Sequence, residues 1–243
     1  MIFLRGRGLL FVKPKKTAGT SVEVALSCNA TPEDIVTPLI EEDERIRWEL
    51  GGQFPVNWAW KASDERDYRA RFEQYLRDGR VPRRFFGLRP GRLWRRRGAR
   101  FFNHMTPAEV LGRAGPGPVA DAFMVTMVRH PYEQVVSYAF HQHDLHGKPF
   151  VDCLAHAVGR PPLNDAYLFG PKTPDFVIRY ERLKDDLAAL EERFALTLVA
   201  KLPQTKHTAR ADRRPAADWL SDAQKAEIRA RHARTFQSYG YRP

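Results

Sequence analysis

The sequence predicts an α/β fold in which helices cover both faces of a parallel sheet. Three short apolar runs, at 8–13, 122–128 and 176–180, have the composition of buried strands. A segment with apolar residues at helical spacing follows each run. Successive strand–helix units are typical of a parallel sheet, because a helix must carry the chain back before the next strand begins.

Each unit has its own boundary signals. In the first, Pro14 ends the strand because proline cannot donate to a sheet ladder, and residues 21–27 predict a short helix. In the second, Pro131 opens the helix that follows the strand. In the third, leucines at helical spacing predict a helix over 181–194.

Further helices are predicted from their start signals. Thr31-Pro32 and Thr106-Pro107 each combine a capping hydroxyl with a proline at the first helical position. The second of these helices is expected to continue through Leu111. Residues 63–78 and 221–236 also have helical patterns that begin at a serine followed by acidic residues.

The whole chain, 1–243, is expected to form one domain with a variable insertion at about 30–100. This insertion is predicted to be irregular or helical. Its tryptophans cluster near glycine and proline, which favours irregular structure. These are Trp48, Trp58 and Trp60.

The net charge of +11 is concentrated in one segment. Residues 80–100 contain nine arginines and no acidic residue, and subtracting these nine charges leaves +2 for the other 222 residues. A localised basic segment points to a localised anionic partner, such as a nucleotide phosphate, an acidic glycan, nucleic acid or a membrane surface. A solvated loop explains the same composition equally well.

Cysteine content and hydropathy predict a soluble, cytoplasmic protein. The two cysteines, Cys28 and Cys153, are too few for a disulfide framework and are expected to be buried thiols. No apolar run approaches the roughly 20 residues of a membrane span. The first residues lack the apolar region and small-residue cleavage site of a signal peptide.

The hexapeptide 16–21, Lys-Thr-Ala-Gly-Thr-Ser, has the composition of a phosphate-binding loop between a buried strand and a helix. Free amides at a helix N-terminus bind anions. Gly19 permits a positive φ or a close approach to the ligand, and Lys16 adds a cation. The loop is not a Walker A motif, in which the lysine follows the second glycine. A turn rich in small polar residues is the plain structural alternative.

A second anion site is predicted at Arg129-His130-Pro131, where the strand 122–128 ends. An arginine fork here, with Ser137 on the following helix, can hold another phosphate. The alternative is an arginine that caps the strand and a serine that bonds its own helix. Two such sites at the carboxyl ends of two parallel strands suit a nucleoside phosphorylated at both ends.

These motifs resemble the carbohydrate-type group of sulfotransferases that use 3′-phosphoadenosine-5′-phosphosulfate (PAPS). Residues 11–21 resemble the family's 5′-phosphosulfate loop, and Val128 to Tyr138 resembles its 3′-phosphate motif. Residues 178–183 and the ending at 236–241 resemble two further family motifs less closely. The resemblance does not extend over about 30–100, where members of the family keep their acceptor-binding elements, so it implies that this insertion lies on the acceptor side of the site. Lys15 and His130 depart from the family pattern, in which a proline and an asparagine or aspartate stand there.

The resemblance implies a P-loop-like sheet, PAPS as cofactor, the bisphosphate PAP as product, and no metal. It also implies a role for each matched residue. Lys16 would stabilise charge on the leaving oxygen. The cofactor-binding residues would be Lys15, Thr17, Ala18, Gly19, Thr20 and Ser21 around the 5′ end, with Arg129 and Ser137 at the 3′-phosphate.

The acceptor hydroxyl needs a group that takes its proton, and His104 is the candidate base. Members of the family often have a histidine in this place, although Asn103 replaces the usual glycine here. A histidine that caps the helix beginning near Thr106 is an equal alternative. Glu23 and Glu181 are substitutes for the role.

The expected acceptor is a carbohydrate, with a small alcohol, a lipid or a phenol as other options. Tryptophans of the insertion are suited to stack on sugar rings, although they fit a core equally well. Two other functions compete with the sulfotransferase. One is a polyanion- or nucleic-acid-binding protein that uses residues 80–100, although nucleic acid is the less expected partner. The other is a P-loop-like nucleotide kinase, which the Walker A mismatch disfavours.

Overall fold

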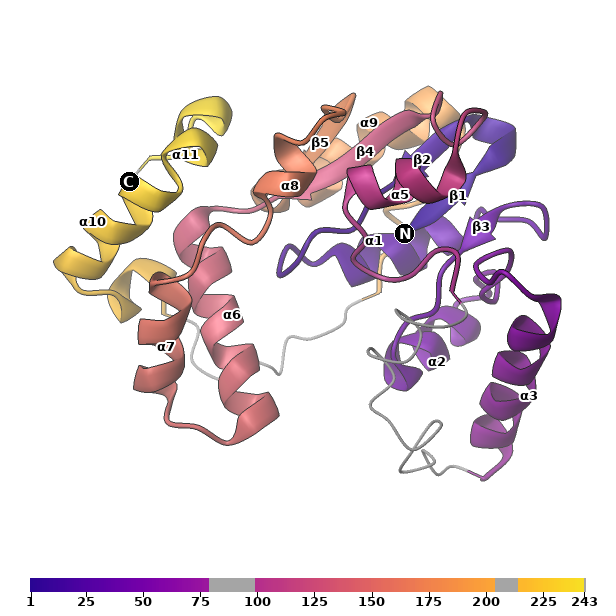
Figure 1. The fold of residues 1–243 in the computed structure, drawn as a ribbon, viewed down its shortest axis with the longest axis horizontal. Helices are drawn as coiled ribbons and strands as arrows, with labels where there is room; N and C mark the ends of the chain where they lie inside the picture. Colours follow the sequence, from indigo (N-terminus) through magenta and orange to yellow (C-terminus); the bar gives the residue numbers. More distant parts are fainter. Residues whose placement is uncertain (79–98, 204–213, 243) are drawn as a thin grey trace.

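The computed structural model describes residues 1–78, 99–203 and 214–242, and these form a mixed α/β structure around a five-stranded sheet (Figure 1). The strands are β1 (Ile2–Leu4), β2 (Leu9–Phe11), β3 (Ile35–Val36), β4 (Phe123–Val128) and β5 (Phe176–Arg179). Their order across the sheet is β3-β1-β2-β4-β5.

The sheet is mixed, which corrects the prediction that it is parallel. The three predicted strands, β2, β4 and β5, do run parallel to one another. The strands β1 and β3 were not predicted, and β1 pairs antiparallel with both β2 and β3. A single 3-10 turn, Arg5–Arg7, joins β1 to β2, and so short a connection can only form a hairpin. Gly8, with a φ of 58°, ends this turn.

Ten α-helices lie within the described residues. They are α1 (Gly19–Ser27), α2 (Glu41–Glu49), α3 (Ala62–Asp78), α5 (Pro107–Ala114), α6 (Pro131–His146), α7 (Phe150–Val158), α8 (Asp165–Leu168), α9 (Leu183–Phe194), α10 (Asp222–Arg231) and α11 (Ala233–Tyr239). The predicted helices after Gly19, Ala62, Pro107, Pro131 and Leu183 are confirmed.

Three local predictions are wrong. No helix begins at Thr31-Pro32, because the Asp34 carboxylate accepts the Thr31 amide at 2.7 Å and holds a turn that leads into β3. Trp48 lies in α2 and not in irregular structure. The last predicted helix is divided at His232, where α10 ends and α11 begins.

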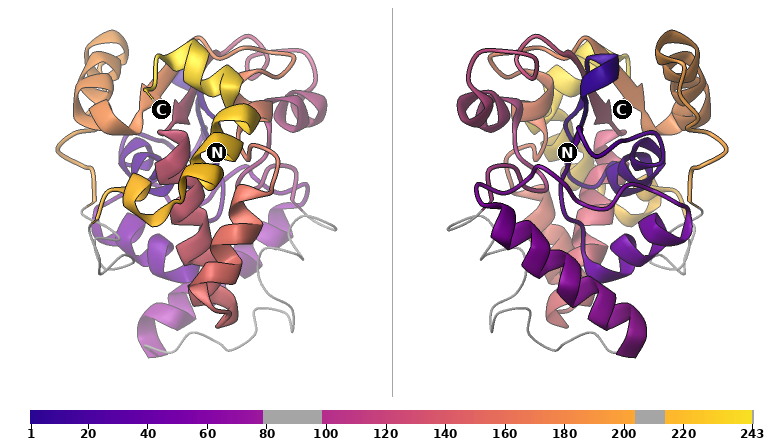
Figure 2. Two further views of the ribbon diagram at one scale, coloured as in Figure 1. Left: turned by 90° about the vertical axis from the view of Figure 1, so that its left-hand side faces the viewer. Right: turned by 90° about the vertical axis from the view of Figure 1, so that its right-hand side faces the viewer.

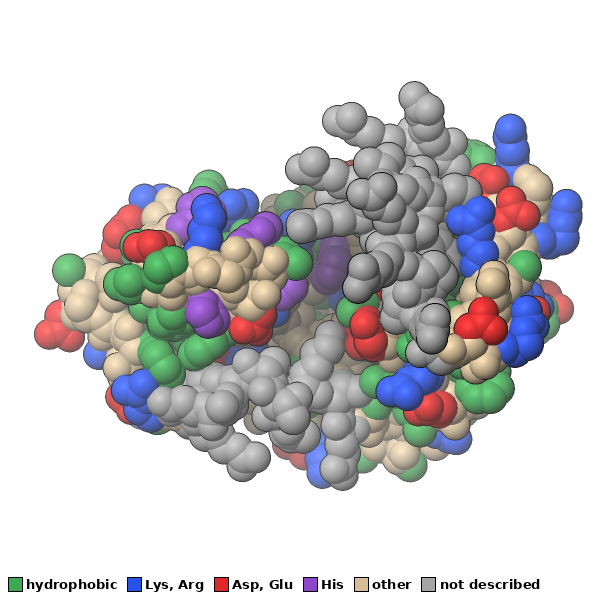
Figure 3. Space-filling model, turned by 90° about the horizontal axis from the view of Figure 1, so that it is seen from below, with side chains coloured by type: hydrophobic (Ala, Val, Ile, Leu, Met, Phe, Trp, Pro, Cys, Tyr) green, Lys and Arg blue, Asp and Glu red, His purple; other side chains and the backbone are tan. Residues whose placement is uncertain are grey.

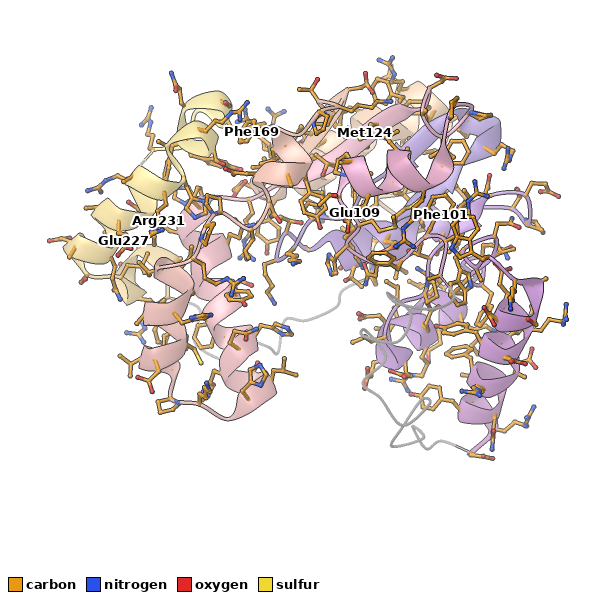
Figure 4. The ribbon with its side chains drawn as sticks, in the orientation of Figure 1. Phe101, Glu109, Met124, Phe169, Glu227 and Arg231 are labelled. Atoms are coloured by element: carbon orange, nitrogen blue, oxygen red, sulfur yellow. The ribbon has the colours of Figure 1, made fainter. Side chains whose placement is uncertain are left out.

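Helices cover both faces of the sheet, as predicted (Figures 1 and 2). On one face, Leu10 and Met124 pack with residues of α3, α5 and α8. On the other, Phe11 and Met127 pack with apolar residues of α1 and α9. Phe101 and Met124, both labelled in Figure 4, belong to the first of these clusters. The alternating inward residues of β2 and β4 thus stabilise both layers.

A third apolar cluster joins α6 and α7 to the C-terminal helices α10 and α11. Val136 and Ile228 are fully buried in it. The helices α6 and α7 extend from one end of the sheet, and α2 and α3 lie at the other end (Figure 1). Nowhere in 1–78, 99–203 or 214–242 is there a helix long and apolar enough to cross a membrane.

Candidate cofactor and transfer site

The two predicted anion motifs emerge at the same edge of the sheet. The strands β2 and β4 are parallel neighbours, and the ladder continues past β2 because the Val12 amide donates to the Val125 carbonyl at 2.9 Å. The loop 12–18 and the turn after Val128 therefore leave the sheet side by side. In Figure 1 the indigo loop before α1 extends toward α6. This edge, at the carboxyl ends of parallel strands, is where α/β proteins bind ligands.

The loop reaches α1 through two residues in the left-handed region. Lys16 has a φ of 62° and Ala18 a φ of 63°. Such backbone costs of order 1 kcal/mol for a residue with a Cβ and persists where the surroundings hold it. Ala18 is also the N-cap of α1, and no side chain caps this helix. The Ser21 amide donates to the Ala18 carbonyl at 3.0 Å, and the amides of Gly19 and Thr20, which precede it, are suited to another acceptor.

The positive φ that was one of the two predicted reasons for Gly19 is wrong, and the structure shows a further reason for a glycine there. Its φ is not positive, and a Cβ built on it would lie 2.5 Å from Cγ of Lys13. The aliphatic part of Lys13 therefore passes directly against the first turn of α1, in space that only glycine leaves open. The Lys13 side chain is 1% exposed, and its Nζ lies 2.5 Å from Oε2 of Glu23 on α1.

Glu23 is enclosed by its partners. Its carboxylate accepts the Thr37 hydroxyl at 3.0 Å and pairs with both Lys13 and the amino group of Met1. Burial raises the pKa of this carboxyl, but the charges of Lys13 and Met1 outweigh burial and hold the pKa well below its ordinary range. Because Glu23 is fully buried, it does not face an acceptor hydroxyl.

Arg129 joins the two anion motifs. Its Nη1 donates to the carbonyl of Lys16 at 3.5 Å, and its Nη2 pairs with Glu133 on α6 at 2.9 Å. The guanidinium carbon lies 4.2 Å from the centroid of the Tyr180 ring. These contacts leave Nε of Arg129 buried without a hydrogen-bond partner among the described residues. A buried donor of this kind fits an anionic ligand.

The predicted hydroxyl residues do not all face the same way. The Thr17 side chain is fully buried and its hydroxyl donates to the sulfur of Met127 at 3.9 Å, so this hydroxyl does not face a ligand. Thr20 and Ser21 lie in the first turn of α1. Ser137 lies half-buried on α6.

His104 does not cap a helix. Thr106 caps α5 itself, and Glu109 completes a capping box with it. His104 lies outside this helix with a φ of 61°, and its Nδ1 is 3.1 Å from the carbonyl oxygen of Lys13. Because a carbonyl only accepts, Nδ1 carries the proton and Nε2 keeps its lone pair. Burial and then the Lys13 charge hold the pKa of His104 well below its usual value.

Glu181 has a structural role at the same edge. Its carboxylate accepts the amide of His130 at 2.8 Å and the hydroxyl of Tyr241 at 2.9 Å. The His130 side chain caps α6 by accepting the Tyr132 amide at 3.2 Å. The C-terminal residues therefore support the turn that carries Arg129. Each oxygen of the Glu181 carboxylate therefore accepts one hydrogen bond from another residue of the protein.

The insertion contributes both core and surface. Trp58 is fully buried, whereas the side chains of Trp48 and Trp60 are 57% and 61% exposed. The guanidinium of Arg100 lies 5.3 Å from the Trp60 ring. Most of the arginine-rich segment, 80–98, lies outside the described residues, and so does the basic binding element that was predicted there.

Three residues near the loop carry no signal in the sequence. Asn164, Tyr167 and Gln134 form hydrogen bonds with Lys15 or His104, across separations of 149, 63 and 119 residues. No local motif marks such contacts, because only the folded chain brings their partners together.

Within the described ranges no group of three or more His, Cys, Asp or Glu side chains could hold a metal ion. His141, His143 and His146 lie toward the end of α6, and His143 contacts the carbonyl of Lys148. Cys28 and Cys153 are free thiols, the first half-buried and the second buried.

No protein-family model, no curated protein and no solved structure matches this chain.

Proposed function

We propose that this chain is a sulfotransferase that moves the sulfuryl group of PAPS to a hydroxyl of a carbohydrate acceptor. The observation that carries this proposal is the contact between Arg129 and the carbonyl of Lys16 at 3.5 Å. It brings the loop that resembles a 5′-phosphosulfate site and the turn that resembles a 3′-phosphate site to one edge of the sheet. A nucleotide phosphorylated at both ends matches this pair.

Bound PAPS supplies a sulfur–oxygen bond with a phosphate as its leaving group. The amides at the uncapped start of α1 are positioned to donate to the 5′ end, and the helix dipole favours negative charge there. Arg129, with its unpartnered Nε, supplies a charged donor for the 3′-phosphate. Thr20, Ser21 and Ser137 add hydroxyl donors.

Lys16 and His104 divide the chemistry of the transfer. Lys16 stabilises the charge that develops on the leaving oxygen as the sulfur–oxygen bond breaks. His104 is neutral, with its proton on Nδ1, so its Nε2 can accept the proton of the attacking hydroxyl. Both residues are tied to the loop that leaves β2, which fixes the base relative to the lysine.

A carbohydrate acceptor suits the surface beside the site. Seen from below, the molecule is hollowed beside the part formed by α6 and α7 (Figure 3). Exposed Trp60, stacked with Arg100, offers an aromatic face of the kind that packs against sugar rings.

The experiment that tests this function is transfer of labelled sulfate from PAPS to a panel of neutral and anionic glycans, with small alcohols and phenols beside them. We expect one glycan class to be labelled, and the Arg129→Ala variant to label it far more slowly at limiting PAPS. Magnesium-dependent phosphorylation from ATP, with no consumption of PAPS, would contradict the proposal and favour the nucleotide kinase.

A further inference from the structure

A short segment around α8 forms hydrogen bonds with the backbone of Lys15, in the loop before α1, and with the backbone of His104, the candidate base. The Asn164 side chain pairs with Lys15 twice: its Oδ1 accepts the Lys15 amide at 2.9 Å, and its Nδ2 donates to the Lys15 carbonyl at 2.9 Å. The same carbonyl accepts Nε2 of Gln134 from α6 at 3.0 Å. Asn164 is only 4% exposed, so water does not compete strongly for these bonds.

Three residues further on, the same segment holds the candidate base. The hydroxyl of Tyr167 donates to the backbone carbonyl of His104 at 2.6 Å, and Tyr167 is 2% exposed. Residues three apart lie on one face of a helical turn. Asn164 and Tyr167 thus reach Lys15 and His104 from a single turn of chain.

The held residues are the ones whose backbone needs support. Lys16, the neighbour of Lys15, and His104 have φ values of 62° and 61°. A residue with a Cβ keeps such a conformation only where its surroundings determine it. The pairing of Asn164 fixes the peptide groups just before Lys16, and the bond from Tyr167 fixes the carbonyl of His104 itself.

We propose that Asn164 and Tyr167 are positioning residues that hold Lys16 and His104 in register for the transfer. As far as turnover is concerned, this inference rests on the proposed function. Neither side chain needs to contact the cofactor or the acceptor. Their effect is geometric, and a displacement of about 1 Å at a reacting group can cost roughly 100-fold in rate.

The chain offers a matched control for Asn164. Asn29, just past the carboxyl end of α1, makes the same double pairing with Thr197: its Oδ1 accepts the Thr197 amide at 2.8 Å, and its Nδ2 donates to the Thr197 carbonyl at 2.9 Å. Asn29 lies at the opposite end of α1 from the loop. Asn164→Ala should lower kcat about 100-fold and change the Kd for PAP less than threefold, whereas Asn29→Ala should leave kcat within twofold.

Double variants separate positioning from a general loss of structure. In a Lys16→Ala background, Asn164→Ala should lower turnover by less than threefold further, because its effect acts through Lys16. Tyr167→Phe should lower kcat by up to about tenfold through the loss of one hydrogen bond, with no further loss in a His104→Ala background. Additive losses in both double variants would overturn the inference.

A readout without turnover tests the same contacts independently. The Lys15 amide should exchange its hydrogen much faster in Asn164→Ala than in the wild type, and at the wild-type rate in Asn29→Ala. If Asn164→Ala is too unstable to measure, Asn164→Asp keeps the acceptor for the Lys15 amide and should retain that protection. Unchanged exchange in Asn164→Ala would refute the positioning role. If the Lys15 amide of the wild type is protected as expected but the protein binds no PAP, the proposed function is refuted, whereas the contacts of Asn164 with Lys15 are not.

Discussion

The Nδ1 atom of His104 lies 3.1 Å from the carbonyl oxygen of Lys13, two residues after β2 ends. This contact sets the tautomer of the candidate base and ties it to the strand that leads into the cofactor loop. The side-chain ammonium group of Lys13 is buried and paired with Glu23, and its charge favours the neutral form of the His104 imidazole. One residue thus connects the base, the first helix and the loop.

His104→Ala should lower kcat by about 10²- to 10⁴-fold, the range for loss of general base catalysis, with little change in the affinity for PAP. Steady-state kinetics at saturating PAPS measure the first quantity and calorimetry the second. A variant with wild-type kcat would show that another group, or water, takes the proton.

The pH dependence of the wild type follows from the same site. Burial and the Lys13 charge lower the pKa of His104, so the imidazole stays neutral as the pH falls through about 6.5, where an exposed histidine is half protonated. The rate should therefore hold at pH 6.5 and fall only at more acidic pH. The profile of kcat/KM against pH checks this, and an acid limb centred above 6.5 would contradict it.

Lys16→Ala should lose mainly turnover, by about 10²- to 10³-fold, because the lysine acts on charge that develops in the transition state. The affinity for PAP should fall much less, since the start of α1 and Arg129 still bind both ends. Lys15→Ala is the matched variant. It should lose far less turnover, because the contacts of Lys15 to Asn164 and Gln134 use its backbone. The opposite order of effects would move the catalytic role to Lys15.

Gly19→Ala should destabilise the fold by about 1–3 kcal/mol, because the new methyl would lie 2.5 Å from Cγ of Lys13. Urea denaturation measures the loss. Gly6→Ala is the control, since nothing lies within 4 Å of a Cβ built at Gly6. Equal stability of the two variants would show that Lys13 does not occupy the space beside Gly19.

Arg129→Ala should weaken PAP binding by about 1.5–3 kcal/mol, the scale of a hydrogen bond to a charged group. The variant also removes the ion pair between Arg129 and Glu133, although Glu133 still accepts the amide of Ala216 at 3.0 Å. Circular dichroism should confirm that it folds. Calorimetric affinity equal to that of the wild type would assign Arg129 a purely structural role.

Local signals predicted the parts of the fold that they control. The apolar runs and Pro14 identify β2, and the signals at Thr106-Pro107 and Pro131 identify the starts of α5 and α6. The strands β1 and β3 contain only three and two residues, which is too short for a periodic pattern. The pairing of β1 with β2 is a local hairpin, whereas the pairing of β1 with β3 joins residues that are distant in sequence.

The candidate site divides in the same way. The residues that the loop and Arg129 motifs mark lie at one sheet edge, because the carboxyl ends of parallel strands meet there. The burial of Thr17 and the passage of Lys13 against Gly19 depend on packing between β2, β4 and α1. The contacts of Asn164 and Tyr167 join segments that are distant in sequence, so no local pattern predicts them.

The proposed function requires that the loop and Arg129 bind one nucleotide phosphorylated at both ends. Calorimetric titration of the wild-type protein with PAP measures this binding, with ATP and Mg²⁺ as the comparison and a thermal shift as the second readout. We expect a micromolar Kd for PAP, a rise in melting temperature, and much weaker binding of ATP. No heat and no thermal shift at saturating PAP, together with a clear response to ATP and Mg²⁺, would contradict it.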